Sequence, residues 1–223
     1  QVEVVDVALH QALHPQACAH AVGRHLGGGH GRARVINLSL GGSTPNATLR
    51  GAIDRATAAG VIVIVAAGNS AAADPNGFAL IATETISRGL VIVAGGVNAA
   101  EQIATFSNGG SNRAGAAAAH YLTALATDVR TFNEEGGIIL ASGTSYSAPA
   151  IAGAVALLAQ AFPNLSSAEI VNLLLSSARD LGAVGTDPIY GRGLVDLSVA
   201  FAARGATSVA GTTVPVSMLT NGT

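Results

Sequence analysis

Three continuous apolar runs stand out along the chain, at 35–42, 61–69 and 90–96, and each closes on glycine or asparagine. Runs of this kind are typical of strands in a parallel sheet, which is buried on both faces. Between the first two, apolar residues recur at helical spacing over 49–59 and stop at Gly60. Strand, helix and strand at this spacing predict the βαβ unit of a doubly wound, mostly parallel sheet with helices on both faces.

The flanking pattern adds further strands and helices. The stretches Val2–Leu9 and 121–126 are expected to be strands, and Thr105–Asn108 a surface loop. The Ala/Leu/Val segment that ends near Gln160 is apolar on all sides, which predicts a buried helix. Pro149 is placed in the first turn of that helix, where a missing N–H does no harm. A capping box at 166–169 predicts another helix to about 178, and a short last helix closes near 203.

A histidine-bearing segment separates the first two predicted strands. It holds five of the six histidines and the single cysteine, Cys18, and a helix is expected from about Pro15 to His25. His10, His14 and Cys18 fall at i, i+4 and i+8, which raises the hypothesis of a metal site. Pro15 breaks that register and no carboxylate joins it, so we interpret the segment as a solvated helix. No metal ligand and no cofactor is identified.

Composition narrows the class of protein. The 223 residues are 49% apolar but include three Tyr, five Phe and no Trp, so the core must be built from aliphatic side chains. We expect one domain over 1–203, with 204–223 a linker or the start of a carboxyl-terminal region. A net charge of −2 gives no electrostatic reason for a nucleic-acid partner. No apolar run reaches the roughly 18 residues of a membrane span.

The strongest chemical signal is the string Gly-Thr-Ser-Tyr-Ser-Ala-Pro-Ala-Ile-Ala-Gly at 143–153. Ser145 is expected at or just inside a helix start, where free N–H groups and the helix dipole favour a developing negative charge. Taken alone, Ser145 could equally be an ordinary N-cap. The string is not the nucleophile elbow of α/β-hydrolases, because Ser147 stands where that motif needs glycine.

Gly-Thr-Ser-x-Ser-x-Pro-x-x-Ala-Gly resembles the active-site serine motif of the subtilisin-like serine proteases, the subtilases. The segment 35–42 is similar to the family's strand and loop that form one wall of the primary specificity pocket. Ala66–Asn69 is similar to the opposite wall with its oxyanion asparagine, and 190–196 to the closing segment after the serine helix. The resemblance covers about 200 residues in the right order. It implies a subtilisin-like α/β fold whose amino-terminal part is missing.

The resemblance also implies the roles of individual residues in peptide-bond hydrolysis. Ser145 would form the acyl-enzyme, and the Asn69 amide with the Ser145 N–H would form the oxyanion hole. The substrate would be a polypeptide, held by Ser39, Leu40, Gly41, Ala66, Ala67, Gly68 and Thr144. We expect the pocket between these walls to admit a fairly large apolar side chain.

A serine nucleophile needs a histidine base and an orienting carboxylate. The family's His-Gly-Thr-His-like motif does not occur here, since His30-Gly31-Arg32-Ala33 lacks the second histidine. The resemblance places Asp6 on the strand after the catalytic histidine. We therefore expect the Asp and His of the triad upstream of Gln1 or on a complementing chain, which would leave this chain inactive by itself. The alternative is an inactive pseudoprotease that acts as a peptide-binding or structural module.

Location and metal content follow from the resemblance alone. It implies a secreted or bacterial cell-surface protein, although no signal peptide is visible, and often structural calcium. The Gly-Arg-Gly-Leu-Val-Asp ending and the tail after it are similar to autotransporter-type bacterial subtilases. No compact acidic cluster of the calcium-loop type is present in the sequence.

Overall fold

The computed structural model describes residues 4–7, 33–106, 109–133, 135–202, 207–208 and 215–216. The helix expected at 15–25, Cys18 and the histidines around it lie outside the described residues.

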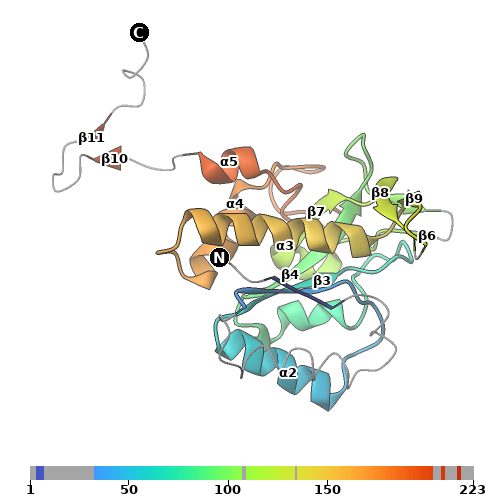
Figure 1. The fold of residues 1–223 in the computed structure, drawn as a ribbon, viewed down its shortest axis with the longest axis horizontal. Coiled ribbons are helices and arrows are strands. Elements are labelled where there is room, and N and C mark those ends of the chain that lie inside the picture. The colour runs from blue at the N-terminus through green and yellow to red at the C-terminus, as the bar shows by residue number, and fades with distance from the viewer. Residues whose placement is uncertain are drawn as a thin grey trace, which may run out of the picture.

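A five-stranded parallel sheet forms the centre of the molecule (Figure 1). Its order is β1 (Val4–Val7), β2 (Val35–Leu38), β3 (Ile62–Ala66), β4 (Val91–Val97) and β7 (Tyr121–Leu125). Each strand is parallel to its neighbour. The three central strands are buried along their whole length, as the continuous apolar runs indicate. The predicted parallel sheet is confirmed.

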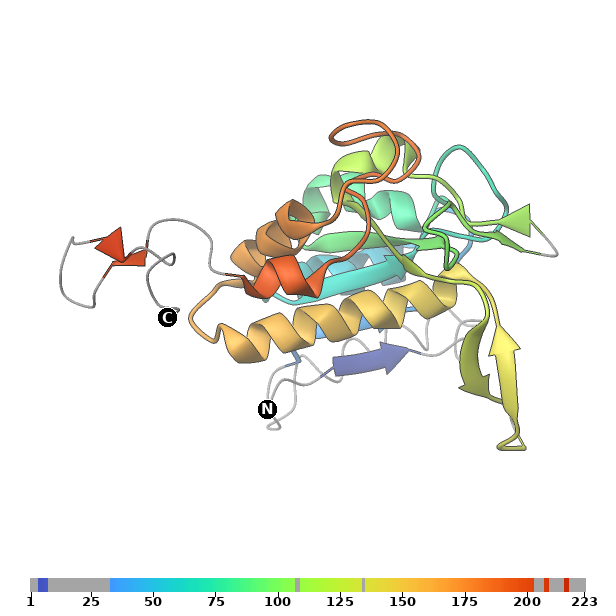
Figure 2. The ribbon, with the colours of Figure 1, turned by 90° about the horizontal axis from the view of Figure 1, so that it is seen from above.

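Helices cover both faces of the sheet (Figure 2). One face carries α2 (Ala47–Ala58) with the 3-10 helices η2 (Ala79–Thr83), η3 (Thr85–Ser87) and η4 (Gly115–His120). The other carries α3 (Thr144–Ala161), α4 (Ser167–Ser177) and α5 (Leu197–Phe201). The doubly wound architecture is therefore confirmed. Over the described residues, no helix combines the length and the apolar character needed to cross a bilayer.

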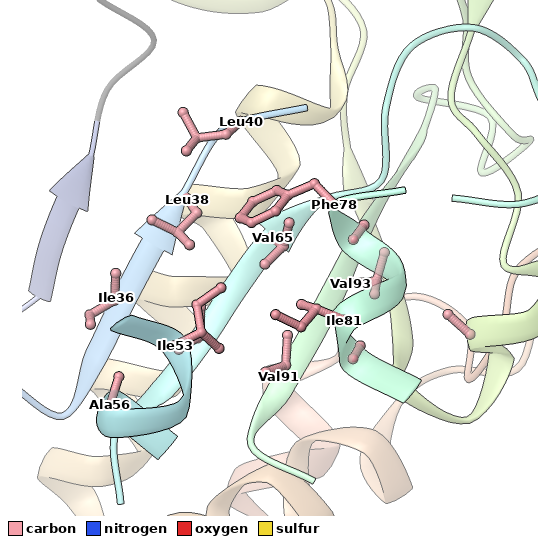
Figure 3. Packing of buried hydrophobic residues seen from close by; sticks show 14 of the residues in the cluster. Ile36, Leu38, Leu40, Ile53, Ala56, Val65, Phe78, Ile81, Val91 and Val93 are labelled. Atoms are coloured by element: carbon pink, nitrogen blue, oxygen red, sulfur yellow. The ribbon is translucent and has the colours of Figure 1, made fainter. Parts of the chain in front are cut away.

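Alternation along the strands divides the core into two layers. Val63 and Val65 of β3 pack with α2 and η2, whereas Ile62 and Ile64 pack with α3 and α4. The first layer is drawn in Figure 3, where Ile53 of α2 lies over the strands. Because successive side chains point to opposite faces, a strand covered on both sides is apolar at nearly every position.

Two predictions about α3 are wrong. The helix begins at Thr144, one residue before Ser145, so Pro149 is the sixth helical residue and lies in the second turn. At that depth the absent N–H removes a helical hydrogen bond, the one to the carbonyl four residues earlier, which is that of Ser145. The helix is also not buried all round, because the side chain of Leu157 is 51% exposed.

Three pairs of short strands lie outside the main sheet. β8 (Val129–Phe132) and β9 (Ile138–Ala141) form an antiparallel hairpin that projects from the body beside the amino end of α3 (Figure 2). β5 (Thr105–Phe106) pairs with β6 (Gly109–Gly110) where a loop was expected. β10 (Thr207–Ser208) pairs with β11 (Pro215–Val216) in the tail. The boundary proposed at 203 stays a prediction.

Candidate active site

The carboxyl ends of β2 and β3 meet the amino end of α3. The loops after the two strands form the walls of a pocket of about 280 Å³, and Ser145 lies at its rim in the first turn of α3. The pocket is lined by Leu40, Gly41, Gly42, Ala66, Gly68, Asn69, Ser70, Asn76, Asn112, Thr144 and Ser145. Seven of the nine residues singled out from the sequence are thus gathered here. The other two, Ser39 and Ala67, are buried beside the pocket and are not part of its lining.

Thr144 ties the wall after β3 to the helix. Its hydroxyl accepts a hydrogen bond from the N–H of Gly68 (3.2 Å) and donates one to Asn69 Oδ1 (2.9 Å). The N–H of Thr144 donates to the same Oδ1 at 2.9 Å. The threonine is fully buried, so these bonds are shielded from water and hold the strand end against the helix start.

The same contacts orient the amide of Asn69. Because both donors are at Oδ1, the Nδ2 group must face the other way, and among the described residues it has no hydrogen-bond partner. Gly143, which has φ +152°, lies beside Nδ2: a Cβ built there would be 3.3 Å from it. The amide therefore presents an unused donor next to the first turn of α3. The N–H of Ser145, in the first turn of the same helix, likewise has no acceptor within α3.

Ser39 holds the backbone of Ser145 in place, a role that the sequence did not suggest. Its hydroxyl donates to the backbone carbonyl of Ser145 at 2.9 Å and accepts from Asn37 Nδ2 at 3.0 Å. This carbonyl is the one that Pro149 leaves without a helical donor. A side chain from the end of β2 thus replaces the missing helical bond, and it fixes the backbone of the serine to one wall of the pocket.

Two asparagines in the pocket were missed by the sequence analysis. Asn112 Oδ1 accepts from the N–H groups of Ser70 and Ala72, and Asn76 Oδ1 accepts from the N–H of Ala79. Their Nδ2 atoms both lie against Gly68, where a Cβ would be 2.7 and 3.0 Å away. Asn112 belongs to a Gly/Ala-rich stretch that resembles a surface loop, so no local signal marked it. The pocket offers amide donors as well as apolar contacts.

No catalytic base is found among the side chains that the structure describes. The one histidine among them, His120, directly precedes β7, and burial lowers its pKa. Ser145 lies at the opposite end of this strand, since the N–H of Gly143 donates to the carbonyl of Ala126. β7 has five residues, which span roughly 16 Å. His120 therefore cannot reach the serine.

The described residues also do not form a binding site of clustered side chains for a structural metal ion. They contain no group of three or more His, Cys, Asp or Glu side chains placed to hold an ion. A calcium loop gathers several carboxylate and carbonyl oxygens around one point. The acidic side chains in the described part of the chain do not meet this requirement.

Comparison with known proteins agrees with the geometry. The model of the subtilase family matches residues 2–193. The chain belongs to the subtilase family, as the serine motif suggested.

The similar proteins include subtilisins and an autotransporter lipoprotein. The chain is 33% identical to subtilisin DY of Bacillus licheniformis over 168 residues, which are 74% of this chain and 56% of subtilisin DY. It is 35% identical to the autotransporter lipoprotein NalP of Neisseria meningitidis serogroup B over 147 residues, 61% of this chain and 14% of NalP. The chain therefore spans little more than half the length of the subtilisin it matches.

Solved structures share the fold. The prenylagaramide maturation protease PagA superposes with a TM-score of 0.68 at 22% identity, over 84% of this chain and 66% of PagA. The self-cleaved protease domain of PatA gives the same score and identity over 84% and 67%. The arrangement of sheet and helices described above is that of subtilisin-like protease domains.

Proposed function

We propose that this chain carries the nucleophile and the oxyanion hole of a serine endopeptidase. The observation that carries the proposal is the orientation of Asn69. Its Oδ1 is held by two donors of Thr144, so its Nδ2 is presented beside Ser145 without a partner in the described structure. An amide fixed in this way costs no reorganisation when negative charge develops, which is the property that makes oxyanion holes effective.

The proposed reaction follows from this arrangement. Ser145 Oγ adds to the carbonyl carbon of the scissile peptide bond while its proton passes to a histidine. The carbonyl oxygen becomes an oxyanion and accepts hydrogen bonds from Asn69 Nδ2 and the Ser145 N–H. The C–N bond then breaks, the histidine gives its proton to the leaving amine, and an acyl-enzyme remains on Ser145. Water hydrolyses this ester by the same steps, which returns the free serine.

The base and the carboxylate of this scheme come from outside the described residues. His120 lies at the wrong end of β7, and we propose that the Asp and His stand upstream of Gln1 or on a complementing chain. The substrate is proposed to be a polypeptide whose side chain enters the pocket between Leu40 and Gly68. Asn76 Nδ2 already donates to the carbonyl of Ala66 at 3.4 Å. The amide of Asn112 favours a side chain with a hydrogen-bonding group over a wholly apolar one.

A secreted or cell-surface location is proposed with the activity. Its support is the similarity to an autotransporter lipoprotein. Structural calcium, which the family resemblance suggested, finds no ligand cluster in the described part of the chain, and no step of the proposed reaction depends on a metal.

A fluorophosphonate probe, which reacts with activated serines, tests the proposal. It would be applied to the longer protein that contains this chain, to its Ser145→Ala variant and to the 223-residue chain. We expect labelling of the longer protein alone. Labelling of the 223-residue chain would place the base within it. Absence of labelling in every form would overturn the proposal and favour a pseudoprotease.

An Asn69→Asp variant of the longer protein tests the oxyanion hole separately. Aspartate keeps the Oδ1 acceptor for Thr144 but has no Nδ2 donor. We expect kcat for a peptide substrate to fall by about 10²–10³-fold or more, with a smaller change in KM. Equal kcat values would exclude Asn69 from the oxyanion hole.

A further inference from the structure

A second hollow adjoins the pocket beside Ser145 that is described above. It has a volume of about 820 Å³ and shares Asn69 with the smaller pocket. Its walls come from the segments after β4 and β7 and from β5 and β9, so it opens at the same edge of the sheet. It is lined by Asn69, Asn98, Thr105, Phe106, Thr127, Asp128, Leu140 and Ser142.

The two hollows meet at Asn69, the residue proposed to hold the oxyanion at the point of cleavage. This step rests on the proposed function. A substrate whose carbonyl oxygen points at Asn69, and whose acyl-side side chain fills the smaller pocket, must continue past Asn69. The larger hollow then receives the first residues on the leaving-group side, since an extended chain advances only about 3.3 Å per residue.

Asp128 gives this hollow its charge. Among the described residues, it is the one ionisable side chain in the lining. Its φ is +53°, a conformation that glycine adopts most easily, although aspartate tolerates it better than most residues. The backbone N–H of Asp128 donates to Ser142 Oγ at 3.0 Å, which fixes the residue beside the start of α3. No ion pair of Asp128 occurs within the described part of the chain.

Apolar groups stand next to this carboxylate. Phe106 and Leu140 line the same hollow, and Leu140 is 66% exposed. Lysine and arginine place a methylene stem on apolar surface while the charged end meets an acceptor. Arg130 faces Leu140 across the hairpin but is not part of the lining. The hollow thus combines a carboxylate that has no ion pair among the described residues with two apolar side chains in an otherwise polar lining.

We propose that Asp128 makes the leaving-group side of the site select a basic side chain in the first two residues after the scissile bond. The carboxylate is exposed, so the preference is modest and sensitive to salt. Exposed ion pairs are worth roughly a twofold to fivefold change in an equilibrium or rate ratio.

Matched peptides test this selection in the longer protein that contains the chain. The peptides are identical except for arginine or citrulline after the scissile bond, because citrulline keeps the shape and loses the charge. We expect kcat/KM to be about fivefold higher for arginine at low salt, and the ratio to shrink as salt is added. In Asp128→Asn the ratio is expected near one. Comparing ratios within each variant cancels any change in folding or in the nucleophile.

Glu135→Gln serves as the matched control, since it removes a carboxylate from the exposed hairpin turn and lies outside the lining. It is expected to keep the wild-type ratio. Equal cleavage of both peptides by the wild type, or an unchanged ratio in Asp128→Asn, would overturn the inference while fluorophosphonate labelling still supports the protease. A protein that neither cleaves nor reacts with the probe would overturn both.

Discussion

The backbone of Ser145 depends on a contact that crosses the fold. Because Pro149 has no N–H, the carbonyl of Ser145 lacks its usual helical donor. The hydroxyl of Ser39 donates to this carbonyl instead, at 2.9 Å. A proline in the second turn of a helix normally weakens it, because the hydrogen bond is lost and the ring crowds the same carbonyl. Here the weakness is offset by a residue at the end of β2, so the strand and the helix start are fixed together.

A double-mutant cycle between Ser39 and Pro149 measures this replacement. Ser39→Ala is expected to lower the free energy of unfolding by about 1–3 kcal/mol, since a backbone carbonyl loses its donor. In a Pro149→Ala background the restored N–H can bond to the Ser145 carbonyl, so Ser39→Ala should cost about 1 kcal/mol less. Urea unfolding of the wild type, the two single variants and the double variant gives the coupling free energy between Ser39 and Pro149.

The cycle has a built-in control. Ser39 also accepts a hydrogen bond from Asn37 Nδ2, and this bond is lost in both backgrounds and cancels. Strictly additive effects would mean that Ser39 does not compensate for the proline.

At the residue scale, the sequence pointed to Ser145 and Asn69 because long strings around them resemble one family. The structure brings both residues to one pocket, and their catalytic roles stay a prediction. Asn76 and Asn112 were missed, because their positions depend on loops that fold back under Gly68. The role of Ser39 was missed as well: it depends on where α3 begins, and the boundary of a helix is less certain than its existence.

At the scale of elements, helix ends with local signals were predicted well. The capping box of α4 is present: Ser166 Oγ accepts from the N–H of Glu169, and the N–H and hydroxyl of Ser166 donate to Glu169 Oε2 at 2.7 and 2.6 Å. The hairpin of β8 and β9 was missed, because its apolar residues are exposed rather than buried. Phe132, for example, is 70% exposed. Hydrophobic patterning predicts burial and gives no warning of such an element.

The capping box predicts a pH dependence of stability. The Ser166 hydroxyl, and then its backbone N–H, lower the pKa of Glu169 by donating to the carboxylate. The folded value therefore lies below the unfolded one, so the ionised form favours the folded state. This contribution is complete above the ordinary value of 4.5 and is lost as the pH falls through the lower, folded value.

Ser166→Ala and Glu169→Gln separate the two parts of the box. Ser166→Ala should lower the free energy of unfolding at neutral pH by about 1 kcal/mol, as for other lost N-caps. Glu169→Gln retains an acceptor but cannot titrate, so we expect its stability to fall less than that of the wild type between neutral pH and acid. Urea unfolding as a function of pH measures both. Parallel pH curves for wild type and Glu169→Gln would contradict the assignment.

At the scale of the whole molecule, the fold was predictable because burial of the sheet on both faces determines the residue types of its central strands. Strands buried on both faces are apolar at nearly every position, and the runs at β2, β3 and β4 show this. The connections between them are short enough to fix a parallel order. The site follows from the same topology, since parallel strands bring their carboxyl ends to one edge. Chemistry that lies outside the described residues, such as a base for the proposed nucleophile Ser145, could not be placed from the fold.

The close fit at the centre of this sheet leads to a last prediction. Gly95 in β4 faces the ring of Tyr121, which is fully buried, donates its hydroxyl to the Asn112 carbonyl, and has a pKa raised chiefly by burial. A Cβ at position 95 would be 1.8 Å from the Tyr121 hydroxyl. We expect Gly95→Ala to destabilise the protein by about 1–3 kcal/mol or more, since strand and ring must move apart.

Gly153→Ala is the matched comparison. This glycine lies inside α3, and a Cβ there would meet no atom beyond the adjacent backbone of its own helix within 4 Å. Alanine in a helix interior is favoured over glycine by about 0.5–1 kcal/mol, so this variant should be more stable than the wild type. Glycine-to-alanine substitution is thus expected to lower the free energy of unfolding at position 95 and to raise it at position 153. One glycine makes room for a buried phenol, whereas the other faces open space. Urea unfolding of both variants decides it, and effects of equal sign would show that the packing around Tyr121 does not limit stability.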